Sequence, residues 1–182
     1  MTKGQTATQH KRLRALVHYV CERCPDPTML GATKLNKVLW YVDTIAYRKD
    51  GQTISGETTY IKRQFGPVPK RILKTLEGLE NDGSIVIRNV PSLGGSRREF
   101  ISLKPSNHSI FTDEERLIID QVIDVICRDH TAASISELSH DAIWEAAELG
   151  EEIPVYAVLA SRAAPIEKRH RDWANKIMAS RG

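Results

Sequence analysis

Apolar residues recur every three or four positions along most of this chain, and that spacing limits it to a largely helical fold. In the clearest case, Thr33 is expected to cap the helix and Gly51 to end it. The apolar stripe of this helix is Leu35, Val38, Leu39, Val42, Ile45 and Ala46. Further helices are expected at about 9–24, 67–81, 112–129, 134–140, 143–149 and 165–179.

Start signals support several of these helices. Pro67 and Pro69 suit the first turn of a helix, where a missing N–H costs little. Two reciprocal capping boxes are expected, Thr112 with Glu115 and Ser134 with Glu137. The helix after Thr112 has an apolar stripe of Leu117, Ile118, Val122, Val125 and Ile126.

Two regions between the helices are rich in β-forming residues. Residues 57–62 are expected to form a short strand, and the runs at 84–90 and 97–103 a hairpin with its tip at Gly94-Gly95. The fold class predicted is therefore α+β and mainly α-helical. It is a single domain of about six or seven helices with a small hairpin or sheet near residues 57–103.

The chain has 182 residues, and a domain of this size buries roughly 70% of its unfolded surface. We expect residues 8–160 to form one domain and residues 161–182 a helical C-terminal extension. No run approaches the roughly 20 apolar residues of a membrane span. The first residues lack the apolar core of a secretory signal, so a cytoplasmic protein is expected.

Charge is sorted along the chain. Residues 113–152 carry twelve acidic and two basic side chains, a net charge of −10, whereas residues 62–104 carry nine basic and four acidic ones. Two interpretations stay open. These regions neutralise one another within the fold, or one of them meets an oppositely charged partner.

No residue pattern points to catalysis, a metal or a cofactor. Cys21-x-x-Cys24 has no second pair and falls within a predicted helix, which favours plain packing. Ser139-His140-Asp141 is contiguous, whereas a catalytic triad is assembled from distant segments, so capping of a helix is favoured. We expect no enzyme activity, no metal site and no cofactor.

A basic helix before a hairpin also suggests a DNA-binding winged helix. Lys70, Arg71 and Lys74 would lie on one side of the helix, and Arg88, Arg97 and Arg98 would carry the hairpin's charge. Because many α+β domains place a helix before a hairpin, DNA binding is kept only as the alternative function.

Short motifs in a fixed order resemble the Panacea domain, the SocA-like antitoxin family. They are Leu35-Asn36-Lys37, Trp40-Tyr41-Val42-Asp43, Gly51, Ile54, Gly56, Tyr60 and Gly66-Pro67-Val68, followed by Ser139-His140, Trp144, Gly150, Ile153-Pro154 and Tyr156. The resemblance runs from about residue 12 to about residue 158. It implies an antitoxin that binds a cognate protein toxin. Neutralisation would be by occlusion, or by delivery to an ATP-dependent protease such as ClpXP.

Interfaces draw much of their binding energy from a few aromatic and arginine anchors. Trp40 and Tyr47 are two turns apart on one helix, and we expect the face that they share to be partly free. The residues predicted to contact the toxin are Lys37, Trp40, Asp43, Tyr47, Lys70 and Arg71. The acidic segment would steer a basic toxin at longer range.

Overall fold

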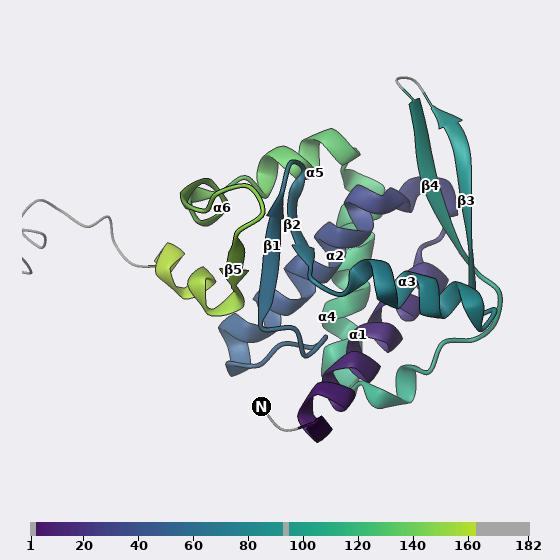
Figure 1. The fold of residues 1–182 in the computed structure, drawn as a ribbon, viewed down its shortest axis with the longest axis horizontal. Helices are drawn as coiled ribbons and strands as arrows, with labels where there is room; N and C mark the ends of the chain where they lie inside the picture. The colour runs from purple at the N-terminus through teal and green to yellow at the C-terminus, as the bar shows by residue number, and fades with distance from the viewer. Residues whose placement is uncertain (1–2, 93–94, 163–182) are drawn as a thin grey trace, which may run out of the picture.

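In the computed structural model, which describes residues 3–92 and 95–162, helix α2 (Pro27–Asp50) runs through the middle of the molecule (Figure 1). The elements that pack against it include α1 (Lys3–Arg23), α4 (Asp113–Asp124), η2 (Val125–Asp129), α5 (Ala132–Leu138), η3 (Val155–Arg162), β2 (Gly66–Pro69) and β4 (Gly95–Ser102). The fold is α+β and mainly helical, as predicted. Because neighbours surround α2, it is buried on more faces than a single apolar stripe implies.

The start of α2 differs from the prediction. Asp26 caps the helix by accepting a hydrogen bond from the Thr28 N–H (2.8 Å), and Pro27 takes the first helical position. The helix is then interrupted at Gly31, whose φ of 58° is left-handed. Thr33 was therefore wrong as the cap, because the Asp-Pro signal lies further upstream. The predicted end at Gly51 is confirmed (φ 70°).

A three-stranded antiparallel sheet covers one side of α2, in the order β2–β1–β5. Its other strands are β1 (Thr59–Arg63) and β5 (Glu152–Pro154). The predicted helical start at Pro67 and Pro69 is wrong, because both prolines lie in edge strand β2. An edge strand tolerates residues that lack an N–H. Helix α3 (Ile72–Asn81) begins only after Arg71.

The predicted hairpin is confirmed as β3 (Ile85–Ser92) paired with β4. It projects away from the helical body (Figure 1). Phe100 at its base is fully buried, whereas Arg97 and Arg98 further out are exposed. Of the predicted tip, Gly94 lies outside the described residues.

The C-terminal half holds the remaining short helices. The Thr112–Glu115 capping box of α4 is confirmed, and α4 continues directly into a π-helical turn, η2 (Val125–Asp129). The second box was misplaced, because Thr131 rather than Ser134 caps α5. The predicted helix at 143–149 is the shorter α6 (Ala142–Ala146). Two 3₁₀ segments complete the list, η1 (His108–Ile110) and η3 (Val155–Arg162).

The predicted helix at 165–179 lies outside the described residues, as does nearly all of the predicted extension. Among the helices that are described, none has the length and apolar character needed to cross a membrane.

Candidate functional site

Asp43 lies fully buried in the middle of α2 and holds the loop after that helix. Its carboxylate accepts hydrogen bonds from the Ser55 N–H (2.8 Å), the Ser55 hydroxyl and the Tyr60 hydroxyl (2.7 Å). Burial raises the pKa of Asp43 to about 6, although these hydrogen bonds oppose the shift. The carboxylate therefore joins α2, the following loop and β1 inside the protein.

Lys37 is enclosed as well, with 1% of its surface exposed. Its ammonium donates a hydrogen bond to the Ser139 hydroxyl, which in turn donates to the Ser136 carbonyl (2.8 Å). Burial lowers the pKa of Lys37 to about 8. Gly66 covers this contact with a φ of 118°, and a Cβ there would collide with the Lys37 ammonium. A lysine beside a serine hydroxyl resembles a base and its nucleophile, but here both groups are enclosed.

The contiguous Ser139-His140-Asp141 run acts locally, as predicted. Asp141 caps α6 by accepting from the Ile143 and Trp144 N–H groups (3.1 and 3.0 Å). The His140 ring stacks on Trp144 with 3.6 Å between centroids, and the Lys62 ammonium lies 3.8 Å from the Trp144 ring centroid. Within the described residues, no group of three or more metal-binding side chains could hold an ion.

A hollow with a mainly apolar lining is the groove of about 230 Å³ between α2, α4, η2 and α5. Residues that line it include Tyr41, Ile45, Ile118, Val125, Ile126 and Leu138. Three of these apolar side chains are well exposed: Ile45 (41%), Val125 (49%) and Leu138 (60%). Exposed apolar residues gathered in one groove are typical of a protein-binding surface. We call this the α2–α4–α5 groove.

Acidic residues border this groove. Asp129 and Glu137 are exposed beside the lining residues His130 and Leu138, and neither forms an ion pair with any described residue. Other acids of the 113–152 segment are neutralised from α1 and α2, through Arg12–Glu115, Arg23–Asp120 and Lys49–Glu114. Asp129 and Glu137 are therefore exposed carboxylates next to the groove in sequence that have no described ion-pair partner.

Comparison with known families identifies the chain. Residues 35–145 match the model of the antitoxin SocA-like family, Panacea domain, which is more than half of the sequence. This chain belongs to the SocA-like Panacea family. No curated protein and no solved structure matches it.

The structure places the first motifs of this Panacea domain inside the protein. Trp40 is 3% exposed and meets Tyr60 edge-on, with 5.0 Å between ring centroids. The free aromatic face predicted for Trp40 is therefore wrong, because β1 lies over that side of α2. Lys37 and Asp43 are enclosed in the same way. These three residues cannot touch a toxin unless the domain opens.

The other predicted contact residues of this Panacea domain reach the surface separately. Tyr47 is half-buried in a hollow next to the α2–α4–α5 groove, and the two hollows share Ile118. Lys70 pairs with Glu152 (2.7 Å), and Arg71 pairs with Glu57 (2.6 Å). The six residues are thus not brought together in one patch, and their role in toxin binding stays a prediction.

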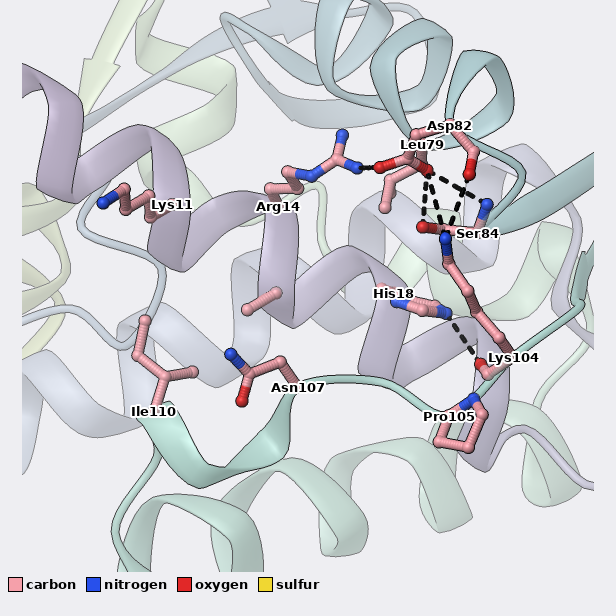
Figure 2. A pocket seen from close by; sticks show the side chains of 11 residues that line it. Lys11, Arg14, His18, Leu79, Asp82, Ser84, Lys104, Pro105, Asn107 and Ile110 are labelled. Carbon is pink, nitrogen blue, oxygen red and sulfur yellow. Dashed lines mark hydrogen bonds and ion pairs between the residues drawn. The ribbon is translucent and has the colours of Figure 1, made fainter.

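A larger hollow of about 510 Å³ lies between α1, the end of α3 and the loop after β4 (Figure 2). Three of the charged groups that line it, Arg14, Asp82 and Lys104, are engaged with one another. Arg14 pairs with Asp82, and the Lys104 ammonium donates to the Asp82 carbonyl (3.0 Å). His18 Nε2 lies 3.1 Å from the Lys104 carbonyl oxygen.

Sequence reasoning missed the groove because its residues were assigned to the core. Ile45 and Val125 belong to the predicted apolar stripes, as does Leu117, which is 58% exposed. The signal was an excess of apolar residues on α4 and at the start of η2, where Ile118, Ile119, Val122, Ile123 and Val125 cover more than one face. An apolar surface wider than a core-facing stripe indicates a second contact face.

Proposed function

We propose that this protein is an antitoxin that binds and neutralises a cognate protein toxin at the α2–α4–α5 groove. Membership of the SocA-like antitoxin family supports a toxin partner. The groove itself supports this location for the toxin site. Side chains of four elements expose apolar surface there, and soluble proteins rarely expose such surface unless it binds a partner.

The occupant that fits this groove is an apolar segment of the toxin flanked by basic residues. Ile45, Val125 and Leu138 offer the apolar contact. Asp129 and Glu137 offer the charge that would attract lysine or arginine at the edges. Tyr47, in the adjoining hollow, extends the surface along α2.

Binding rather than catalysis accounts for the activity in this proposal. Lys37 and Ser139 are arranged like a base and its nucleophile, but they are only 1% and 2% exposed, so a substrate has no access to them. Neutralisation proceeds by occluding the toxin or by delivering it to an ATP-dependent protease such as ClpXP. A toxin that is degraded only when this protein and the protease are both present would identify delivery.

The test uses the product of the neighbouring reading frame, produced alone and together with this protein. We expect growth arrest with the first and rescue with the pair. Leu138→Asp and Val125→Asp should each weaken binding of that product by at least about 30-fold, the effect of losing an interface hot spot. Isothermal titration with the purified proteins measures this.

A matched control is available on α3. Leu73 is as exposed as Leu138 (67% against 60%) but lies outside the groove. Leu73→Asp should therefore leave the affinity unchanged. If folded Leu138→Asp and Val125→Asp proteins bind as tightly as the wild type, the groove is not the toxin site. If the neighbouring product neither arrests growth nor binds, the antitoxin assignment itself fails for that pair.

A further inference from the structure

Two cysteines far apart in the sequence touch inside the protein. Cys24 lies just after the end of α1, and Cys127 lies in the π-helical turn η2. Their sulfur atoms are 3.4 Å apart, although 103 positions separate the two residues. The cysteine spaced like a redox motif, Cys21, contributes nothing to this contact. The pair formed by the fold is therefore not the pair that the Cys-x-x-Cys spacing suggests.

The surroundings favour a thiolate at one of the two sulfurs. The hydrogen bond between the thiols lowers the pKa of Cys24 to about 7, and the nearby Lys34 ammonium acts in the same direction. Lys34 is held in place because its ammonium donates to the Cys127 carbonyl (3.1 Å). By contrast, burial raises the pKa of Cys21 well above its usual range. Of the two sulfurs in contact, Cys24 is the one whose pKa is lowered by its surroundings.

The Cys127 side of this pair lies next to a hollow, which Cys24 does not line. Cys127 lines a hollow of about 690 Å³ between the start of α2, the hairpin and the start of α5. Arg97, Arg98 and His130 also line it, and among the described residues of its lining there is no carboxylate. Both thiols are nevertheless buried, at 6% and 2% exposure, so access is limited to a compact neutral molecule.

We propose that Cys24 and Cys127 form a redox modification site, which a hydroperoxide such as hydrogen peroxide converts into a disulfide. The Cys24 thiolate attacks the peroxide, the O–O bond breaks, and a sulfenic acid and hydroxide are formed. The Cys127 sulfur then attacks the Cys24 sulfur, the S–O bond breaks, and the oxygen leaves as water with the Cys127 proton, while the hydroxide of the first step takes up the proton that Cys24 had lost. In sum, two thiols are oxidised and one peroxide is reduced to two molecules of water.

The bond would tie the end of α1 to η2. Val125 and Ile126 of the same turn line the α2–α4–α5 groove, so oxidation would fix one wall of that groove. This consequence rests on the proposed function, whereas the disulfide itself does not. The experiment below therefore tests the disulfide without a toxin.

Tryptic mapping resolves the pairing because each cysteine falls in a different peptide. The peptides are residues 15–23 with Cys21, 24–34 with Cys24 and 117–128 with Cys127. The folded full-length protein is treated with hydrogen peroxide, remaining thiols are alkylated, and the digest is analysed without reductant. We expect a linked peptide of 24–34 and 117–128, with a mass about 2 Da below the sum of the two. It should disappear on treatment with dithiothreitol.

Two variants sharpen the result. Cys21→Ser should form the linked peptide as the wild type does. Cys127→Ser should form none, and its Cys24 should instead be trapped as a sulfenic acid by dimedone. Should Cys127→Ser not fold, the wild-type map still decides. A Cys21–Cys24 link, or three cysteines that stay alkylatable after peroxide treatment, would overturn the proposal.

Thermal unfolding is an independent measurement. A bond that closes so long a loop restricts the unfolded chain, so the oxidised protein should melt at least about 5 °C above the reduced one. This gain should be lost in Cys127→Ser and retained in Cys21→Ser. An oxidised protein that melts at or below the temperature of the reduced form would contradict a disulfide that the native fold accommodates.

Discussion

The ammonium of Lys37 donates a hydrogen bond to the hydroxyl of Ser139, across 102 positions of sequence. This single contact joins the central helix α2 to the end of α5, and Gly66 of β2 closes over it. Three separate motifs of the family therefore meet at one buried point.

Gly66 should tolerate no side chain. Its φ of 118° disfavours any L-residue, and a Cβ would collide with the Lys37 ammonium. Gly66→Ala should lower the free energy of unfolding by about 2–4 kcal/mol. Gly83 is a matched control, since its φ of 66° is also positive but the space around it is open. Gly83→Ala should cost only about 1 kcal/mol in urea unfolding. Equal losses for the two variants would argue against the collision.

Lys37 should make stability depend on pH in the alkaline range. Its pKa is 10.5 when unfolded and about 8 when folded, so the unfolded chain binds more protons between these values. Stability should therefore rise with pH across this window, by about 3 kcal/mol from this residue. In Lys37→Met that rise should be absent, and Ser139 keeps its bond to Ser136. Urea unfolding of both proteins from pH 8 to 10.5 tests this. A constant difference between them would mean that the lysine is not desolvated.

Asp43 should have the opposite dependence, in the acid range. Burial raises its pKa from 3.8 to about 6, so the folded protein binds more protons between these values. The stability contributed by protonation is complete below pH 3.8 and is lost as the pH rises through 6. Relative to Asp43→Asn, the wild type should gain about 2 kcal/mol as the pH falls from 6 to 4. Chemical unfolding at each pH measures the difference, which should stay flat if Asp43 is not desolvated.

Removing the Asp43 carboxylate altogether should lower the free energy of unfolding more than replacing it with a neutral amide. Asp43→Ala leaves the Ser55 N–H and the Tyr60 hydroxyl without their acceptor in a closed interior. A loss of more than about 3 kcal/mol is expected, because unsatisfied buried donors add to the cavity. Asp43→Asn keeps an acceptor and should lose less. If the alanine variant proves the more stable of the two, the hydrogen-bond network is not what holds the loop.

Trp40→Ala should damage the fold rather than the toxin contact. The ring is 3% exposed and packs on Tyr60, so its truncation should cost about 3–5 kcal/mol. Calorimetry should show a lower Tm, and binding should fall only to the extent that the protein unfolds. A Trp40→Ala protein that melts like the wild type yet fails to bind its partner would restore Trp40 as a surface contact.

The parts of the fold that were predicted correctly depend on local signals. The Thr112–Glu115 box, the end of α2 at Gly51 and the β3–β4 hairpin each follow from residues close together in sequence. The errors have a different origin. Pro67 and Pro69 suit both a helix start and an edge strand, and only pairing with β1 selects the strand.

The candidate site could not be predicted from the sequence because it too depends on contacts between distant segments. Whether Trp40 or Tyr41 of α2 faces solvent depends on which elements pack on each side of the helix, and these come from residues 59–69 and 113–138. Periodicity ranks the faces of a helix by apolarity but does not say how many are covered. Lys37 and Asp43 were misjudged likewise, because burial of a charge requires partners such as Ser139 and Tyr60 that only the fold supplies.

The enclosure of Lys37, Asp43 and Gly66 also bears on how such chains are recognised and redesigned. A sequence search based on these motifs recognises family members by their buried residues. Buried residues do not indicate which partner a member binds. Two members could share every motif residue and still differ at Ile45, Val125 and Leu138, where specificity is decided in our proposal. A library that varies only the groove would thus sample new partners while keeping the same folded support.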